Sequence, residues 1–413
     1  MPSPLDELRP RSHDALVRLI EKGVDIPNPP TLDIGPEVDL DRISGRDVTL
    51  YPGCRIYGAK TVISAGVKLG AEAPVTIDDC RLGPDVQLKG GFFKSSVFLE
   101  KANLGSGAQV RDACLLEEEA NGAHCVGLKQ TILLSFVTLG SLVNFCDCLM
   151  AGGTSRRDHS EVGSSYVHFN FTPDGDKTTP SLFGDVPRGV MLDQPRIFLG
   201  GQGGAVGPVR VGFGTVVAAG SILRHDVLAD GRLVVAASHP GLEREHVPRA
   251  YFNLPRVVAN NIVYLANLVA LEQWYVHVRR PFFAAQELGA LVYDGALEML
   301  ALAKAERAKR LAAMAAKVEP TDEGRRVLRE RGAAIGALFE REPPAHGRQA
   351  FLSAFEAALA GDGGPDSRGF TQTIQQLPAD TVALGVAWLG QLVDALCAQA
   401  AELLRPLPLF QDH

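Results

Sequence analysis

A short polar insert carries residue types that suit acid–base chemistry and anion binding. The letters TSRRDH at 154–159 place Arg156, Arg157 and His159 almost side by side, and His168 follows them. Imidazole titrates near neutral pH, so His159 is a candidate general base. The two arginines are candidates to clamp a phosphate or carboxylate through paired hydrogen bonds. The sequence favours a plainer interpretation, a solvated polar loop, because exposed charge clusters are common and contribute little.

The element that must position these residues is a six-residue repeat. From residue 48 the sequence reads VTLYPGCRIYGAKTVISAGVKLG, with an aliphatic residue at every sixth position. The repeated residues are Leu50, Ile56 and Val62; Ile63, Leu69 and Val75; Leu82 and Leu88; Leu104 and Val110; and Val211, Val217 and Leu223. A period of six over many turns predicts a parallel β-helix, in which each hexad supplies one short strand and one turn. A β-sandwich would instead alternate with a period of two.

We expect this β-helix to run from about Val38 to about Val235, with three columns of aliphatic side chains inside it. Small residues at the corners permit tight turns. Coils of such a solenoid contact only their neighbours, so its ends need caps. We therefore expect three parts: an N-terminal helix and cap at 1–37, the β-helix with loop insertions at 38–245, and an α-helical domain at 246–413.

The repeat loses its register between about residues 116 and 207. This interval contains the TSRRDH insert and a second irregular piece, FNFTPDGDKTTPS at 169–181. Loops that project from a rigid scaffold are where functional residues concentrate. Lys129 and Asn144 fall on neighbouring coils of the same interval, so they are candidates to face a shared cleft.

Beyond Pro240 glycine becomes less frequent, and Ala, Leu, Glu and Arg dominate. Apolar residues there recur at helical spacings. We expect helices at 256–278, 284–317, 321–342 and 379–404, with a further short helix at 5–22. Their apolar stripes are better explained as a packed core than as a cofactor site.

The composition excludes several classes of protein. The chain has 413 residues and a net charge of −7, and this acidic balance argues against nucleic-acid binding. No run approaches the roughly 18 consecutive apolar residues that a membrane span needs. The first 22 residues lack the apolar stretch of a signal peptide. Seven cysteines, an odd number, favour reduced thiols in a cytoplasmic protein.

Four segments make the β-helical part similar to a known family, and together they span about half the chain: GRDVTLYPGCRIYG (45–58), VTLGSLVNFCDCLMAGG (137–153), FNFTPDGDKTTPS (169–181) and VRVGFGTVVAAGSILRHDV (209–227). They resemble the acetyltransferase domain of the bifunctional N-acetylglucosamine-1-phosphate uridyltransferase and glucosamine-1-phosphate acetyltransferase. The resemblance implies a left-handed β-helix of the hexapeptide-repeat acyltransferases. It also implies a homotrimer with sites between subunits, acyl-CoA (acetyl-CoA) as co-substrate, and a sugar phosphate or nucleotide sugar as acceptor.

The resemblance also assigns roles to single positions. In that family a histidine takes a proton from the sugar amine, which then attacks the acetyl thioester. A gapless alignment of 137–153 puts Asp147 at this position, and a solvated carboxylate is a poor base for an ammonium group unless burial raises its pKa. Phe171 stands where the family has tyrosine. Asn170 and Lys177 match the family and are expected to bind substrate.

A metal enzyme is a further alternative, because three imidazoles with a water form a recognised catalytic zinc site. His124, His159 and His168 would be the ligands, as in the trimeric γ-class carbonic anhydrases. The closely spaced histidine pair of those enzymes is absent, so we expect no metal. Cys146 and Cys148 lack a second cysteine pair and are expected to act as small buried hydrophobes.

The first hypothesis is therefore an acyl-CoA-dependent sugar N- or O-acyltransferase with His159 or Asp147 as its base. The substrate-binding candidates are Lys129, Asn144, Arg156, Arg157, His168, Asn170 and Lys177. The competing hypothesis is a non-catalytic trimeric β-helical scaffold or a sugar-nucleotide-binding protein, because the histidine and tyrosine of the family are replaced.

Overall fold

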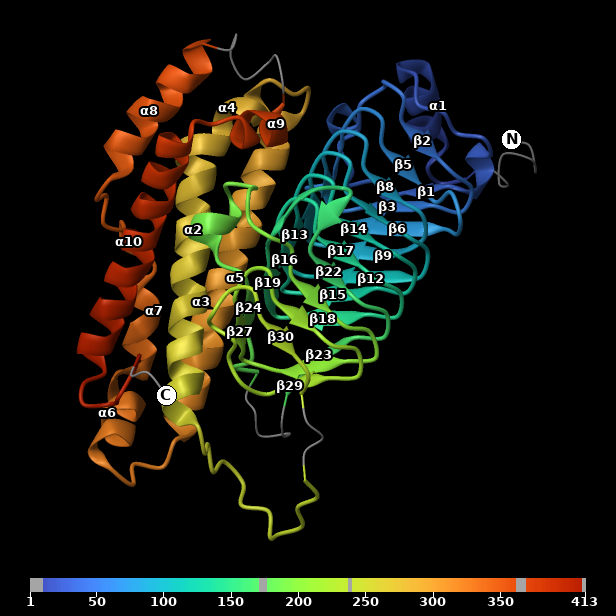
Figure 1. Ribbon diagram of the computed structural model, residues 1–413. Coiled ribbons are helices and arrows are strands. Elements are labelled where there is room, and N and C mark those ends of the chain that lie inside the picture. Colours follow the sequence, from blue (N-terminus) through green and yellow to red (C-terminus); the bar gives the residue numbers. More distant parts are fainter. Residues whose placement is uncertain (1–9, 171–176, 237–239, 362–368, 411–413) are drawn as a thin grey trace.

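The computed structural model describes residues 10–170, 177–236, 240–361 and 369–410. Its first part is a left-handed parallel β-helix, and helices form the part that follows. The helices stand beside the β-helix along its length (Figure 1). This arrangement confirms the predicted fold class. Phe171 lies outside the described residues.

The described strands of the β-helix form three parallel sheets, which we name after their first strands. The β1 sheet contains β1 (Asp33–Ile34), β3 (Arg55–Tyr57), β6 (Val75–Asp78), β9 (Gly91–Lys94), β12 (Ala108–Arg111), β15 (Gly127–Lys129), β18 (Asn144–Cys146), β23 (Val167–Phe169), β26 (Gly204–Val206) and β29 (Ile222–Leu223). The β4 sheet contains β4 (Val62–Ile63), β7 (Arg81–Leu82), β10 (Ser96–Phe98), β13 (Cys114–Leu116), β16 (Ile132–Leu133), β19 (Cys148–Met150), β24 (Ser181–Phe183) and β27 (Arg210–Val211). The β2 sheet contains β2 (Thr49–Leu50), β5 (Lys68–Leu69), β8 (Gln87–Leu88), β11 (Asn103–Leu104), β14 (Asn121–Gly122), β17 (Thr138–Leu139), β22 (Glu161–Val162), β25 (Phe198–Leu199), β28 (Val216–Val217) and β30 (Leu233–Val234).

The strand register explains the six-residue repeat. In the β2 sheet, Leu50 pairs with Leu69, and Leu69 pairs with Leu88. In the β1 sheet, Ile56 and Ile77 pair in the same way. All of these side chains are buried, as are the other aliphatic residues of the hexads. Each coil therefore adds one apolar side chain to each of three columns, which stack into a continuous core.

One corner of the β-helix is built from residues with left-handed backbone conformation. Asp79, Ser95, Ala113, Gln130 and Asp147 have φ between 44° and 58° and follow successive strands of the β1 sheet. We call this stack the corner column. It joins the β1 sheet to the β4 sheet, and Asn170 follows β23 at the same corner.

Helices cover the outer face of the β4 sheet. The bundle contains α3 (Leu254–Trp274), the π-helical turn η4 (Tyr275–Arg279), α4 (Arg280–Ala284), α5 (Gly289–Lys317), α6 (Glu323–Arg331), the 3-10 turn η5 (Gly332–Ala334), α7 (Ile335–Leu338), α8 (Arg348–Gly361), α9 (Phe370–Gln375) and α10 (Ala379–Leu403). In it, α5 packs on β7, β10 and β13, and α3 packs on β24. The helix α5 approaches the sheet closely at Gly295, where a Cβ atom would lie 2.4 Å from Cδ of Arg81.

The remaining short elements lie at the rims of the β-helix. Helix α1 (His13–Lys22) lies over the first coil at one end of the molecule (Figure 1). It is accompanied by the 3-10 turns η2 (Pro29–Thr31) and η3 (Leu40–Arg42). The antiparallel hairpin β20 (Gly153–Ser155) and β21 (Asp158–His159) and the helix α2 (Val186–Gly189) interrupt the coils farther along.

Two described helical stretches are long and apolar enough to span a membrane by length and composition, Leu254–Ala284 and α10. In the first, 83% of the apolar window is buried inside the protein, as in the core helix of a bundle. In α10 the buried share is 33%. Length and composition alone are weak evidence for a span.

A buried ion cluster joins the bundle to the β-helix. Nη1 of Arg279, in the π-helical turn, lies 2.9 Å from Oε1 of Glu117, and Nη2 contacts Glu118. The hydroxyl of Tyr275 donates to Glu117 over 2.7 Å. The Arg279 guanidinium lies over the ring of Phe370, 3.8 Å from its centroid. Because Arg279 is only 1% exposed, the two carboxylates supply its charge compensation in place of water.

We predict that Arg279→Met destabilises the fold by about 3–5 kcal/mol, because it leaves buried carboxylates without their cation. Chemical denaturation measures this loss as a change in the free energy of unfolding. The matched control is Arg280→Met, since Arg280 is the exposed neighbour. Equal stability of both variants would mean that the cluster does not hold the bundle in place.

Candidate functional site

A polar cleft of about 190 Å³ opens at the corner column, between the β-helix and α5. It is lined by Lys129, Gln130, Asn144, Cys146, Asp147, His168, Phe169, Asn170, Lys177, Thr179, Glu306, Arg307 and Arg310. Three coils, those of β15, β18 and β23, therefore meet one helix there, together with Lys177 and Thr179. The cleft brings together six of the nine residues that the sequence singled out: Lys129, Asn144, Asp147, His168, Asn170 and Lys177.

Asp147 forms an ion pair with a residue of the helical bundle. Its Oδ1 lies 2.8 Å from Nη2 of Arg307, and the two side chains are 19% and 3% exposed. Burial raises the pKa of the Asp147 carboxyl, while the Arg307 charge opposes that rise. Asp147 stands at the position expected for the base. Its desolvation raises the pKa, which makes it a better base, whereas its ion pair with Arg307 has the opposite effect.

Arg307 joins three segments of the chain. Besides its ion pair with Asp147, its Nη1 donates to the carbonyl oxygen of Lys177 over 3.2 Å. One turn farther along α5, Nε of Arg310 donates to Oε1 of Glu306 over 2.7 Å. Arg307 therefore holds the backbone of Lys177 near the corner, while Arg310 is closer to solvent, with 29% of its side chain exposed.

His168 lies inside the β-helix. Its register partner is the buried Ala205, and its ring lies 6.4 Å from that of Phe145, so it occupies the inward-facing column of the β1 sheet. Burial lowers the pKa of His168 to about 4, and the nearby Arg307 charge adds to this effect. Its Nε2 lies 2.7 Å from Oγ of Ser181, which accepts a hydrogen bond from the backbone N–H of Val209. The Ser181 hydroxyl can donate to this nitrogen when the imidazole is neutral, and His168 lies in the packed interior beneath the cleft.

Polar side chains form the rest of the wall. Lys129, Asn144, Asn170 and Lys177 are exposed at the surface of the cleft. Gln130 is buried beneath them in the corner column, and its Oε1 has no hydrogen-bond partner among the described residues. An unsatisfied buried acceptor is costly, so this oxygen is available to a donor group. The wall can thus bind an anion and several hydroxyl or amine groups.

The TSRRDH insert lies at a different corner. It forms the β20–β21 hairpin between β19 and β22, so strand β19 separates it from Asp147. Nη1 of Arg156 donates to the carbonyl oxygens of Glu119 and Phe136 and to Oγ1 of Thr138. Arg156 therefore satisfies the backbone of its own corner.

The other two members of the insert also lie away from the cleft. Arg157 is exposed, and Nδ1 of His159 contacts the carbonyl oxygen of Arg156 at 3.0 Å. The structure does not bring either of them to Asp147, Asn170 or Lys177.

The three histidines considered for zinc occupy separate places. His124 is exposed and lies 3.0 Å from Oγ of Ser141, His159 lies in the hairpin, and His168 lies inside the β-helix. Within the described ranges, no group of three His, Cys, Asp or Glu side chains is arranged to hold a metal ion. Cys146 and Cys148 lie on different strands on either side of Asp147, and burial raises the pKa of both thiols.

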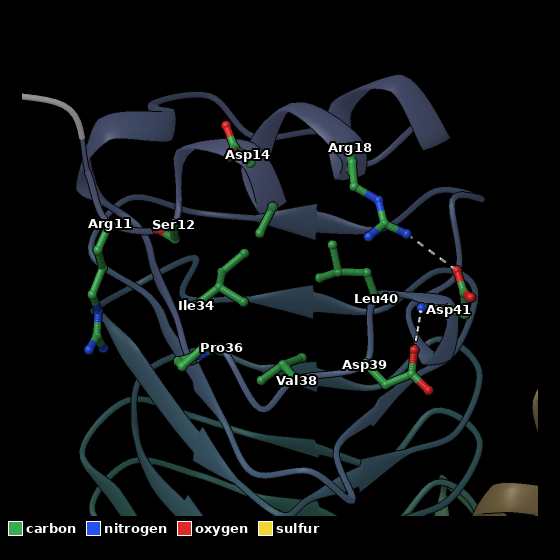
Figure 2. Close-up of a pocket in the computed structure, with 12 residues that line it drawn as sticks. Arg11, Ser12, Asp14, Arg18, Ile34, Pro36, Val38, Asp39, Leu40 and Asp41 are labelled. Carbon is green, nitrogen blue, oxygen red and sulfur yellow. Dashed lines mark hydrogen bonds and ion pairs between the residues drawn. The ribbon is translucent and has the colours of Figure 1, made fainter. Parts of the chain in front are cut away.

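A second hollow of about 500 Å³ lies where α1 meets the first coil (Figure 2). Ile34, Val38 and Leu40 line it together with charged groups from α1 and the following loop. Arg18 and Asp41 form an exposed ion pair there, and the Asp41 backbone N–H donates to Asp39 (Figure 2). This hollow lies between the capping helix α1 and the first coil, and its lining contains none of the candidate site residues from the sequence.

Comparison with known proteins gives one consistent result. No protein-family model matches the chain. Curated proteins named "Bifunctional protein GlmU" do match it. The one from Thermotoga maritima is 26% identical over 223 residues, 54% of this chain and 44% of the relative. The one from Clavibacter sepedonicus is 28% identical over 190 residues, 46% of this chain and 34% of the relative. The one from Carboxydothermus hydrogenoformans is 28% identical over 233 residues, 55% of this chain and 46% of the relative.

The repeat region resembles GlmU. This finding confirms the resemblance that the sequence segments predict. The chain spans less than half the length of each of these GlmU relatives, and each match covers only about half of the chain.

Sequence reasoning missed the residues that α5 contributes, Glu306, Arg307 and Arg310. A signal for one of them was present. The buried stripe of α5 includes Leu300, Ala303, Arg307 and Leu311, at spacings of three or four. A single arginine within an apolar stripe indicates a buried charge that needs a partner on another element.

We predict that the His168 imidazole stays neutral well below pH 6. Its pKa of about 4 lies below the value of about 6.5 for an exposed histidine, because burial disfavours the charged ring. The unfolded chain takes up this proton first, so stability is lost as pH falls from about 6.5 towards 4. An NMR titration of the histidine ring signals measures the midpoint, with His168→Gln to assign the resonance. A midpoint near 6.5 in the folded protein would contradict the interior placement.

Proposed function

We propose that the cleft at the corner column transfers an acyl group from a CoA thioester, acetyl-CoA in the first instance, to a sugar phosphate. The observation that carries the proposal is Asp147, a desolvated carboxylate that pairs with Arg307 in a cleft also lined by Lys129 and Lys177. Such a site combines a proton acceptor with cations that attract an anionic acceptor substrate. The resemblance to GlmU supports the class of reaction.

Asp147 is the proposed general base. As the amine or hydroxyl of the sugar attacks the thioester carbonyl carbon, its proton passes to Asp147. The new C–N or C–O bond forms, the C–S bond breaks, and the leaving thiolate takes up a proton to give free CoA. Desolvation favours this role because it raises the pKa of Asp147 towards that of a useful base.

The polar side chains of the cleft position the acceptor. Lys129 and Lys177 are proposed to attract its negative charge, and Asn144 and Asn170 to hydrogen-bond its hydroxyl groups. His168 supports the wall from inside without touching the substrate. His159, Arg156 and Arg157 lie at another corner and have no part in this proposal.

Binding without turnover is a second candidate, and the Asp147–Arg307 ion pair favours it. If Asp147 takes a proton, the buried Arg307 loses its compensating charge, and this opposes proton transfer. A nucleotide sugar or a sugar phosphate would then be held as a ligand.

The resemblance also bears on the cellular compartment and the oligomeric state. We propose a cytoplasmic homotrimer, in which the β1 and β2 sheets provide the contacts between copies, because the bundle covers the outer face of the β4 sheet. A nucleotide sugar is the alternative acceptor to the sugar phosphate in this proposal.

The test is release of free CoA when the full chain is mixed with acetyl-CoA and glucosamine 1-phosphate. Turnover is expected, and Asp147→Asn should lower kcat by about 10²–10⁴-fold with little change in KM, because only proton transfer is lost. The control His159→Ala should leave turnover unchanged. The activity should fall at acid pH with a midpoint above the usual aspartate pKa, because burial raises that value.

Equal turnover in Asp147→Asn would exclude this residue as the base. Binding of glucosamine 1-phosphate by calorimetry without any CoA release would favour the second candidate, and absence of both would overturn the proposal.

A further inference from the structure

We propose that the helical bundle supplies the subsite for the phosphate of the ligand, with Arg310 of α5 and Lys177 as its two arms, and that the cleft is complete within one chain. This inference rests on the proposed function for the ligand class, but Arg310 lies outside the four segments that carry the resemblance. It assigns a binding role to the helical domain.

Arg310 has the free hydrogen-bonding capacity that a phosphate needs. Its Nε is used by Glu306, which fixes the plane of the guanidinium along α5. No hydrogen bond joins its two Nη groups to another described residue, and the side chain is partly exposed in the cleft. A guanidinium held at one edge presents its remaining N–H groups in a fixed fork, which suits phosphate oxygens.

Arg307 is unsuited to the same role. Its side chain is 3% exposed and already contacts both the Asp147 carboxylate and the Lys177 carbonyl. It is therefore a positioning residue, which holds the backbone of Lys177 one helical turn from Arg310. The Lys177 side chain is exposed, and both it and Arg310 line the cleft.

The charge balance of the cleft fits a dianion. The cationic side chains of its wall are Lys129, Lys177, Arg307 and Arg310, and the carboxylates are Asp147 and Glu306. Four positive and two negative charges leave an excess of +2. A phosphate monoester carries about −1.5 to −2 at neutral pH, so it compensates this excess, whereas a neutral sugar does not.

The same geometry places the whole site in a single chain. The resemblance implies a site shared between subunits, yet here α5 of the same chain forms the wall opposite the corner column. The ion pairs of Glu298 with Lys60 and Arg81 hold α5 against the β-helix, and the Arg279 cluster holds the π-helical turn of the same bundle. The wall is therefore a fixed part of the fold.

Calorimetry with glucosamine 1-phosphate and with glucosamine tests the subsite. Arg310→Gln should weaken binding of the phosphate by at least about 10-fold, the loss expected for one charged hydrogen-bonding partner. Binding of glucosamine should not change. The matched control is Lys309→Gln, the neighbouring position on α5 with a 72% exposed side chain that does not line the cleft. Equal affinities of both variants for the phosphate would overturn the assignment.

A mixing experiment tests completion within one chain. Arg310→Gln and Lys177→Gln are unfolded and refolded together, and binding of glucosamine 1-phosphate is measured. A site within one chain predicts no recovery, whereas a site shared between subunits would regain wild-type sites in mixed oligomers. Loss of phosphate binding in Arg310→Gln without any acyl transfer by the wild type would leave this inference standing and remove the proposed function. If Arg310→Gln leaves acyl transfer unaffected, the proposed function stands and this inference is overturned.

Discussion

The ion pair between Asp147 and Arg307 connects the two halves of the molecule at the place where the site is formed. Asp147 is fixed by the corner column, and Arg307 is fixed by the packing of α5 on the β4 sheet. Both charges are largely withdrawn from water, so each requires the other for compensation. The position of the bundle therefore decides the electrostatics of the cleft, and a shift of α5 would leave two uncompensated charges.

Because of this ion pair, the helical domain takes part in forming the cleft. A β-helix alone would present Asp147, Asn170 and Lys177 on an open surface, where water screens their charges. With α5 in place, the same residues line a walled cleft that contains an excess of cations. The buried Arg279 cluster also holds the bundle against the β-helix. It thereby keeps the bundle where Arg307 and Arg310 reach the corner. The scaffold and its cover thus form one binding unit.

The sequence predicted the scaffold well because the scaffold is repetitive. The hexad residues Leu50, Leu69 and Leu88 lie in one column because each coil repeats the same local geometry, and α10 begins at the predicted Ala379 because its apolar pattern is local. The cleft was only half predictable. Asp147 and Lys177 could be proposed from resemblance, but Arg307 and Arg310 lie more than a hundred residues away and reach the corner through tertiary packing. His168 shows the converse difficulty, because a register within the sheet, which the irregular sequence obscures, turns its side chain inward.

The central claim is that Asp147 and Arg307 are coupled across the interface between β-helix and bundle. A double-mutant cycle of Asp147→Asn and Arg307→Gln, followed by chemical denaturation of the full chain, measures that coupling directly. Contacting charged residues show coupling energies of about 0.5–3 kcal/mol, and we expect at least about 1 kcal/mol here because both side chains are shielded from water. Additive effects, with a coupling below about 0.3 kcal/mol, would contradict the account, since such additivity is typical of residues that do not touch.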